Sequence, residues 1–287
     1  MSVYIRQHAV NIDYKVGESW IILNNIELSI KHKVEAVGIP LKEWNVKINY
    51  GIKTGLNEAF IIQKEIRDKL IEEDPKSAEI IRPILRGRDI KRYTIDFNEL
   101  YLINTHNGYI KEDGMKVPAI EINEYPAIKK WLDYGNWNKK SRTNSNFERL
   151  SKRTDKGITP YNLRSLAYME DLNKPKILYA EIVQTPKFYL DLEGEYAPEA
   201  TSFMLIGDNL ESLIKYLNSN TVAWIFKHFY AGGGLGEGFR YKKAFIEKLP
   251  IPKNILTQDN DELIESQIQN ILDLNDEEIE YIKGTLK

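Results

Sequence analysis

The residues of this 287-residue chain that could do chemistry are scattered rather than clustered. The four histidines are His8, His32, His106 and His228, and no two have the His-x-x-x-His or His-x-Glu spacing that brings ligands onto one metal ion. Cysteine is absent, which excludes thiolate metal sites and disulfides and fits a reducing compartment. His106 stands in the polar loop Asn104–Gly108, where a hydrogen-bonded structural role is the simpler interpretation. The sequence therefore predicts no metal site.

Motifs for nucleotide binding and covalent chemistry are also missing from the sequence. A phosphate-binding loop needs Gly-Lys-Ser/Thr in direct succession, whereas Gly51-Ile52-Lys53-Thr54 separates the glycine from the lysine. The glycine-rich segment Gly232–Gly238 lacks the Gly-x-Gly-x-x-Gly spacing and follows an expected helix rather than a strand. The Gly-x-Ser-x-Gly nucleophile turn does not occur.

Signatures of DNA-modifying catalysis are incomplete as well. A metal-dependent nuclease needs a carboxylate pair followed by a lysine, and Asp13-Tyr14-Lys15 and Asp74-Pro75-Lys76 match only the end of that pattern. A base-modifying methyltransferase needs a polar pocket after a strand, commonly Asn/Asp-Pro-Pro-Tyr/Phe, and no such tetrapeptide occurs. We therefore predict that the chain alone is not an enzyme. A nuclease site assembled from dispersed carboxylates is the open alternative.

The charge of the chain is divided unevenly along its length. The total is −2, but residues 257–287 hold nine acids against two lysines, a charge of −7 that leaves +5 for the rest. The excess is concentrated in Arg82–Arg92, with five basic residues against one acid, and in Lys129–Lys156, with nine against three. Basic stripes favour phosphate binding because each neutralised phosphate releases counterions. A solvated surface is the alternative interpretation of such runs.

Hydrophobic patterning predicts an α+β fold, with mixed twisted sheets, packed helices and a C-terminal helix. Alternation and β-branched or aromatic residues predict strands at Trp20–Leu23, Val46–Asn49, Ala59–Ile62, Leu100–Ile103, Lys176–Val183, Lys187–Asp191 and Ser202–Ile206. Helical spacing predicts helices at Asn25–Ala36, at Lys64–Glu73, from a cap at Asp208 through Leu217, and around Val222–Phe229. The aromatic residues of the last helix are expected to be core.

Two segments suggest the domain organisation. Leu249-Pro250-Ile251-Pro252 should be extended and mark the exit from the globular body, which predicts a body at 1–252 and an acidic helical segment at 253–287. Ile264, Ile268, Ile271 and Leu274 form a helical stripe that needs a partner, either the body or another subunit or domain. Packing on the body, with the acids merely solvated, is the simpler alternative. No run of apolar residues is long enough to span a membrane and no signal peptide is recognisable, so a cytoplasmic location is expected.

Several turn-forming and basic segments occur in an order typical of one protein family. They are Leu41–Trp44, Gly51–Phe60 (GIKTGLNEAF), Ile84–Tyr93 (ILRGRDIKRY), Leu102–His106, Tyr125–Ile128, Lys174–Ile177, Leu217–Asn220, the glycine-rich loop ending at Arg240, and Leu249–Pro252. Together they resemble the TaqI-like specificity domain, the target-recognition domain at the C-terminal end of type IIG restriction-modification enzymes and related adenine methyltransferases.

The resemblance implies that the chain recognises double-stranded DNA in sequence-specific fashion and positions methyltransferase and nuclease domains, in cis or in trans, on the target site. It implies no cofactor for this chain, while the parent enzyme would use S-adenosylmethionine and Mg²⁺. A protein-interaction module that docks through the C-terminal helix is the other alternative that the sequence leaves open.

Family signatures shared by members with different target sites suggest backbone contacts rather than base reading. The candidates for DNA backbone binding are Lys53, Thr54, Arg86, Arg88, Lys91, Arg92, Arg240, Lys242 and Lys243. Base reading is expected in more individual segments, because Arg and Asn make the paired contacts that distinguish bases in the major groove. The candidates for base reading are Asn57, Arg142, Asn144, Asn146, Arg149, Tyr161, Asn162 and Arg164.

Overall fold

The computed structural model describes residues 23–138, 145–232, 238–254 and 261–285. Two compact units are distinguished by their internal contacts. Unit 1 comprises residues 1–47, 182–187 and 208–287, and unit 2 comprises residues 48–181 and 188–207. Strands and helices are mixed in both, which confirms the α+β class. The predicted division into 1–252 and 253–287 differs from these two units, which are defined by contacts. It stays a prediction about domains.

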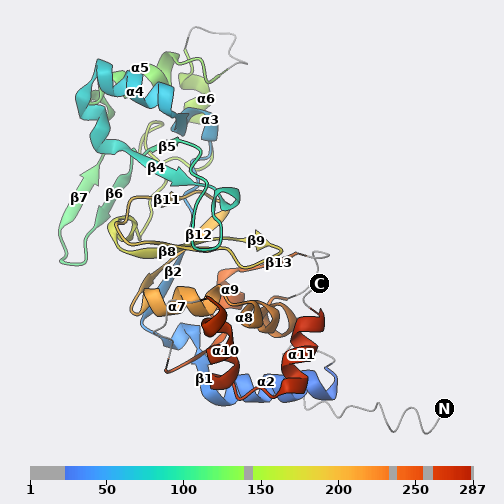
Figure 1. Ribbon diagram of the computed structural model, residues 1–287. Coiled ribbons are helices and arrows are strands. Elements are labelled where there is room, and N and C mark those ends of the chain that lie inside the picture. Colours follow the sequence, from blue (N-terminus) through green and yellow to red (C-terminus); the bar gives the residue numbers. More distant parts are fainter. Residues whose placement is uncertain (1–22, 139–144, 233–237, 255–260, 286–287) are drawn as a thin grey trace. The chain divides into compact units, whose positions relative to one another are not determined.

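Unit 2 contains two four-stranded sheets and a hairpin. The first sheet has the order β10-β8-β12-β2 and consists of Phe188–Asp191, Lys176–Ala180, Ser202–Gly207 and Val46–Tyr50. The second has the order β11-β4-β5-β3 and consists of Ala197–Pro198, Ile81–Leu85, Leu100–Ile103 and Ile61–Gln63. Strands β6 (Asn107–Ile110) and β7 (Lys116–Ala119) form the antiparallel hairpin (Figure 1). Parallel pairing of β11 with β4 brings residues 197–198 beside 84–85.

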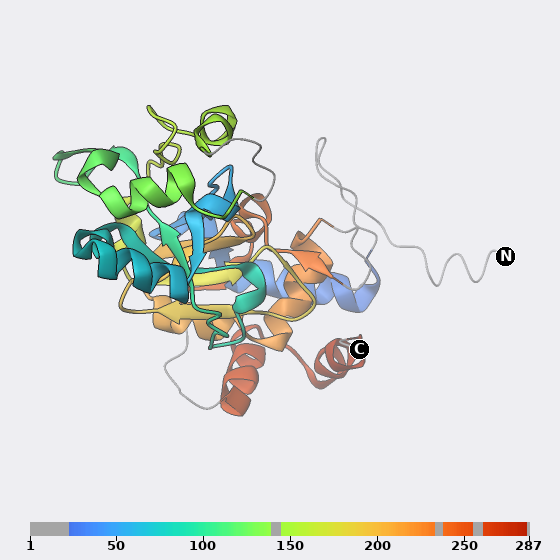
Figure 2. The ribbon, with the colours of Figure 1, turned by 90° about the horizontal axis from the view of Figure 1, so that it is seen from above.

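The helices of unit 2 enclose one continuous apolar core. They are α3 (Asn57–Phe60), α4 (Lys64–Glu73), α5 (Pro126–Tyr134) and α6 (Phe147–Lys152), with the short 3₁₀ helices η2 (Pro75–Ile80), η3 (Gly87–Asp89), η4 (Ile122–Glu124) and η5 (Glu170–Asn173). Helices α4 and α5 lie side by side (Figures 1 and 2). Phe60, Ile84, Leu102, Ile128 and Leu163 are all fully buried in this core. The turns that leave the sheets are thus anchored on a rigid interior.

Unit 1 is mainly helical. Its helices are α2 (Asn25–Val37), α7 (Leu210–Leu217), α8 (Asn220–Ile225), the π-helical turn η6 (Phe226–Tyr230), α9 (Lys243–Ile246), α10 (Asp261–Ile271) and α11 (Asp276–Thr285), with the 3₁₀ turn η1 (Leu41–Glu43). Its strands pair as β1 (Gly38–Pro40) with β14 (Pro250–Pro252), and β9 (Ile182–Val183) with β13 (Phe239–Arg240). Trp224, Phe226 and Phe229 are buried, which confirms the expectation that these aromatic residues are core.

Several predicted elements are found at their predicted residues. Helix α4 has the predicted bounds, and α2 begins at a capping box formed by Asn24 and Glu27 and ends at Gly38. The strands predicted near 46–49, 100–103, 176–183, 187–191 and 202–206 are all present, although the 176–183 segment is divided into β8 and β9. The sequence signals for these elements are local: they are the capping residues at helix ends and the spacing of hydrophobic residues.

Three local predictions differ from the structure. Asp208 does not cap α7, because Asn209 holds that position in a left-handed conformation and Asp208 instead accepts a hydrogen bond from Asn45 Nδ2 at 2.8 Å. Residues 59–62 are not one strand, since α3 continues to Phe60 before β3 starts. Of the strand predicted at 20–23, only Leu23 is described, and it is not in a strand.

The segment after 252 is packed within unit 1. Helix α10 contacts α7 and α8, and α11 contacts α2 (Figure 1). The predicted stripe is partly right. Ile264, Ile268 and Leu274 are buried as predicted, but Leu272 is the buried residue where Ile271 was expected. Pro250–Pro252 is extended as predicted, but it is a buried strand inside unit 1 rather than an exit from the body.

Two acids of this segment make specific contacts, so the acidic face is not solvated throughout. Glu265 accepts hydrogen bonds from Ser219 Oγ at 2.9 Å and from the Thr221 amide at 3.2 Å, at the start of α8. Glu278 is buried and accepts hydrogen bonds from Lys33 Nζ at 2.8 Å and Ser29 Oγ at 2.7 Å, both in α2. Burial raises the pKa of Glu278, but the hydrogen bonds from Lys33, Ser29 and the Asn275 amide outweigh it and lower its pKa below the usual 4.5.

Glu278→Gln should therefore destabilise unit 1 by about 1–3 kcal/mol at neutral pH, because it removes charged hydrogen bonds from a buried site. The folded-state pKa lies below the unfolded-state value, so the contribution of Glu278 is present above the usual pKa of 4.5 and is lost as pH falls through the folded-state pKa. Urea unfolding across this acid range should show a shallower pH dependence for the variant. Exposed Glu280, whose one ion pair within the described residues is with Lys283 at 2.8 Å, provides the control Glu280→Gln, which should stay within about 0.5 kcal/mol. Equal losses in both variants would contradict the assignment.

Candidate nucleic-acid interface

Residues 51–57, which lead from β2 into the start of α3 in unit 2, are fixed by close approach to residues 198–202. The Gly51 amide donates to the Ser202 carbonyl at 2.9 Å, and the Ile52 amide donates to the Pro198 carbonyl at 2.8 Å. A Cβ atom at Gly51 would lie 1.9 Å from the Glu199 carbonyl oxygen, so only glycine permits this backbone contact. The glycine in the GIKTG signature is therefore a packing requirement.

The buried carboxylate of Glu199 joins three turns of unit 2. Its Oε1 accepts from Asn57 Nδ2 at 3.3 Å, and its Oε2 accepts from the amide and hydroxyl of Thr201 at 2.9 and 2.7 Å. The Thr201 hydroxyl in turn accepts from the Gly87 amide at 3.0 Å. Residues 51–57, 86–89 and 199–202 are thus held together, and we call them with residues 153–164 the loop cluster.

Arg86 is committed to an ion pair within this loop cluster. Its Nε and Nη2 each donate to Asp89, at 2.8 Å to Oδ2 and 2.8 Å to Oδ1, and Asp89 is 2% exposed. Asp89 also accepts from the Arg86 amide at 3.0 Å and from Asn98 Nδ2 at 3.1 Å. The hydrogen bonds to Asp89 raise the pKa of Arg86. This planar, two-bond pair shapes the turn at η3.

Arg153 links residues 153–164 to the GIKTG loop. Its guanidinium donates to the carbonyls of Thr54, Asp155 (2.7 Å), Pro160 (3.3 Å) and Asn162, and it lies 4.5 Å from the centre of the Phe60 ring. The residue is 6% exposed, and burial lowers its pKa to about 10, which leaves the group charged at neutral pH. Backbone carbonyls of two separate loops therefore share one buried cation.

The predicted backbone-binding residues of unit 2 differ in availability. Lys53 and Arg88 are exposed, and the described part of the chain provides no ion-pair partner for either. Lys91 pairs with Asp96 at 3.1 Å, and the Arg92 guanidinium lies 5.4 Å from the centre of the Tyr93 ring. Thr54 is fully buried, and its hydroxyl donates to Asn57 Oδ1 at 2.6 Å while accepting from the Leu56 amide.

The remaining predicted cations belong to unit 1. Arg240 is half-buried in β13, Lys242 is exposed, and Lys243 lies 3.7 Å from Glu247. The nine predicted backbone-binding residues are thus divided between the two units, six in unit 2 and three in unit 1. Their roles stay predictions.

Among the predicted base readers, Arg142 and Asn144 lie outside the described residues. Asn146 is buried and donates from Nδ2 to the Gly135 carbonyl at 2.7 Å. Arg149 donates to Glu58 at 2.9 Å and to Asn138 Oδ1 at 3.2 Å. Asn146 is therefore used by the fold, whereas Arg149 is held by contacts that lie near the surface.

Of the four remaining candidates, Asn57 donates to Glu199, as described above, and the other three lie in the 157–164 loop. Asn162 is 1% exposed and donates from Nδ2 to the Ile120 carbonyl at 2.8 Å, so its amide is used inside the unit. The Tyr161 hydroxyl donates to Asp133 at 2.8 Å, and burial together with that hydrogen bond raises its pKa. Arg164 is exposed and lies 3.2 Å from Asp155. Arg164 is the most accessible of these three candidates.

Sequence reasoning did not select Glu199, Thr201 or Arg153. Arg153 lies in a stretch with eight other basic residues, and nothing local marks it as the buried one. Within the described residues there is no group of three or more His, Asp or Glu side chains arranged to hold a metal ion. Nor does the described part of the chain contain a helix long and apolar enough to cross a membrane.

The family model for the TaqI-like C-terminal specificity domain matches residues 82–251, more than half of the chain. The chain therefore belongs to this family, and its role is DNA recognition. The match includes η3, residues 153–164 and residues 199–202 of the loop cluster. It confirms the resemblance carried by the sequence motifs.

Individual relatives are more distant. The Type II methyltransferase M.MjaIV of Methanocaldococcus jannaschii is 25% identical over 232 residues, which cover 79% of this chain and 69% of the methyltransferase. Two solved structures are similar, one of the type IIL restriction-modification enzyme MmeI in complex with DNA (TM-score 0.47, 16% identity) and one of the type IIG restriction endonuclease BpuSI (0.46, 13%). The alignments cover 81% and 86% of this chain but 27% of each of those chains. TM-scores of this size support no conclusion beyond the family match.

Arg153→Lys should destabilise unit 2 by about 2–4 kcal/mol, because one ammonium group cannot replace a planar fork that serves four carbonyls. Urea unfolding measures the loss, and amide hydrogen exchange should show reduced protection in residues 51–57 and 157–163. The matched control is Arg164→Lys, since Arg164 is exposed and pairs only with Asp155 in the described chain; it should change stability by less than about 0.5 kcal/mol. Unchanged protection in Arg153→Lys would remove Arg153 from its linking role.

Proposed function

We propose that this chain recognises a specific sequence of double-stranded DNA and positions the methyltransferase and nuclease parts of a restriction-modification enzyme on that site. The observation that carries the proposal is the family match over residues 82–251. The loop cluster supports it physically, because specificity requires side chains presented from loops on a rigid scaffold.

Phosphate contacts are assigned to the exposed cations of the loop cluster. Lys53 and Arg88 are exposed and have no ion-pair partner within the described chain, so a phosphate would not have to displace an internal carboxylate. Arg153 and the pair of Arg86 with buried Asp89 hold the backbone on which these residues stand. Lys91 is a weaker candidate because Asp96 already neutralises it.

Base reading is assigned to Arg149 and Arg164. Both make ion pairs near the surface, with Glu58 at 2.9 Å and Asp155 at 3.2 Å. Exposed ion pairs contribute only about 0–1 kcal/mol, so exchanging a carboxylate for a base edge costs little. An arginine fork donates two hydrogen bonds to guanine O6 and N7, which is the commonest specific contact in the major groove.

Catalysis is assigned to other parts of the parent enzyme, supplied in cis or in trans. The observation behind this assignment is that no complete catalytic motif occurs in the sequence. S-adenosylmethionine and Mg²⁺ would accordingly be bound by those other parts. A test is direct: the pure chain with Mg²⁺ should leave plasmid DNA intact, and cleavage would contradict this assignment.

Arg88→Ala and Lys53→Ala should each weaken binding to duplexes of any sequence and reduce the slope of log K against log salt by about 1. The measurement is a fluorescence-anisotropy titration at several salt concentrations. Lys283→Ala in α11 is the control, because Lys283 is exposed and paired with Glu280 within unit 1, and it should leave the slope unchanged. Failure of the unaltered chain to bind duplex DNA at low salt would contradict the proposed function itself.

Selection of bound duplexes from a random library should enrich one motif, and the preference should persist at two salt concentrations. Arg149→Ala or Arg164→Ala should relax the preference at individual positions, by about 1–3 kcal/mol each. An unchanged motif in both variants would exclude these two residues as base readers while leaving duplex recognition intact. Binding without enrichment would reduce the function to attraction by a basic surface.

A further inference from the structure

The 157–164 loop of unit 2 is closed at its base and held from the interior. The Gly157 amide donates to the Asn162 carbonyl at 2.8 Å, which joins the two ends of the loop. The buried guanidinium of Arg153 donates to the Pro160 carbonyl at 3.3 Å, near the middle of the loop. The loop backbone is therefore fixed, and side chains that point outward from it are presented in a defined place.

Asn107, the first residue of β6, holds the same loop a second time. Its Oδ1 accepts from the Ile158 amide at 2.7 Å, and its Nδ2 donates to Ser165 Oγ at 2.7 Å. A Cβ atom at Gly157 would lie 2.3 Å from Asn107 Oδ1 and 2.6 Å from the Leu163 carbonyl oxygen, so a larger residue does not fit there. The start of the loop is thus packed closely against the hairpin.

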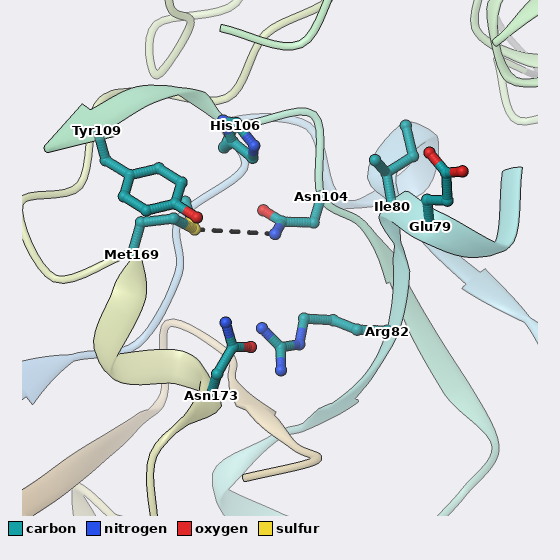
Figure 3. A pocket seen from close by; sticks show the side chains of 8 residues that line it. All are labelled: Glu79, Ile80, Arg82, Asn104, His106, Tyr109, Met169 and Asn173. Carbon is teal, nitrogen blue, oxygen red and sulfur yellow. Dashed lines mark hydrogen bonds between the residues drawn. The ribbon is translucent and has the colours of Figure 1, made fainter. Parts of the chain in front are cut away.

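The residues next to Asn107 are themselves held in place. His106 Nδ1 accepts from the Gly108 amide at 3.2 Å, and the His106 carbonyl accepts from the Ile120 amide at 3.0 Å. The side chains of His106 and Tyr109 line a polar pocket of about 280 Å³ (Figure 3), and the centres of their rings are 5.2 Å apart. Asn107 therefore positions the loop from a fixed strand.

The polar side chains of the loop are used inside unit 2. The Thr159 hydroxyl donates to Asn162 Oδ1 at 2.5 Å, and Asn162 Nδ2 donates to a backbone carbonyl at 2.8 Å. The Tyr161 hydroxyl donates to a carboxylate of α5 at 2.8 Å. The side chains that the loop exposes to solvent are those of Ile158 and Arg164.

Ile158 is the most exposed large apolar side chain of the described residues, at 75%. An isolated surface isoleucine needs no explanation by itself. Here the backbone on both sides of the side chain is fixed, so the isoleucine is held in solvent instead of folding back onto the core. The surrounding residues 147–164 include five basic residues against two acids, which favours a polyanionic partner.

We propose that Ile158 contacts the C5-methyl group of a thymine in the major groove, the groove that also presents the guanine edge assigned to Arg164. This inference rests on the proposed function. Among the base edges, the thymine methyl is the apolar group, and it lies in the major groove together with guanine O6 and N7. Contact between the methyl group and Ile158 removes apolar surface of both from water. The loop then reads one base by an apolar contact and another by hydrogen bonds.

Replacement of thymine by uracil tests this contact, because it removes the methyl group and leaves every hydrogen-bonding atom of the base in place. The motif enriched by duplex selection supplies the DNA, and each thymine of either strand is replaced in turn. The Kd of the full chain is measured by fluorescence anisotropy. At one position, uracil should weaken binding about fourfold, the effect of burying one methyl group less. Ile158→Ala should bind the thymine and uracil duplexes equally.

Ile110→Ala is the matched control, since Ile110 is also exposed, at 63%, and lies on the β6–β7 hairpin. It should keep the full difference between thymine and uracil. Thermal melting checks that each variant is folded. If Ile158→Ala leaves binding unchanged, or weakens the thymine and uracil duplexes by the same factor, the side chain does not contact the methyl group and the proposal is overturned.

Asn107→Ala tests the positioning of Ile158. It removes the acceptor of the Ile158 amide and should abolish most of the difference between thymine and uracil, while the slope of log K against log salt stays unchanged. Asn107→Asp keeps an oxygen that accepts from this amide, so it should retain the difference even where its added charge lowers affinity for both duplexes. A difference that persists in Asn107→Ala would exclude Asn107 as a positioning residue.

Failure of this inference and failure of the proposed function give different results. An enriched motif whose thymines can all be replaced without loss, or a motif without A·T pairs, would refute the thymine contact and leave sequence-specific recognition standing. A chain that enriches no motif would refute the proposed function and this inference with it.

Discussion

The arrangement of the loop cluster depends on one buried cation, the guanidinium of Arg153. It is satisfied by backbone carbonyls of Thr54, Asp155, Pro160 and Asn162 rather than by a paired carboxylate. Burying a charge costs free energy that only several well-placed hydrogen bonds can offset, so all of these carbonyls must be present together. Arginine suits this position because its donors point in fixed directions. Arg153 consequently holds the GIKTG loop and residues 153–164 together, although about one hundred residues separate them in the chain.

A division between buried and surface charges follows from this arrangement. Asp89 and Glu199 lie inside the loop cluster and are fully engaged in shaping turns, whereas Arg149 and Arg164 make ion pairs that water can screen. Surface pairs contribute little to stability, so they can change partner when a polyanion approaches. Buried pairs cannot be exchanged without loss of the fold. Arginines and carboxylates that are buried thus serve as scaffold, and we propose that the arginines at the surface contact DNA.

Elements whose signals lie within a few residues of each other were predictable from the sequence, whereas elements formed by distant segments were not. Helices α2 and α4 were predictable because a capping box, Gly38 and Pro75 act within a few residues. Strand β14 was not recognised as part of a core, because pairing of Pro250–Pro252 with Gly38–Pro40 joins distant segments that contain proline. Thr54, Asn146 and Asn162 were reasonable candidates as polar loop residues. Their burial comes from segments far away in sequence, and no local pattern distinguishes an amide that reads a base from one that holds a carbonyl.

Lys176 shows how unit 2 accommodates a buried charge. Lys176 is fully buried, yet it is compensated by Asp191 at 2.8 Å and by the Leu172 carbonyl at 2.9 Å. Burial still lowers the pKa of Lys176, which measures the desolvation that the partners must offset. Arg82 shares the Leu172 carbonyl with this network. The Leu172 carbonyl therefore compensates two cations, Lys176 and Arg82, whose burial would otherwise be unfavourable.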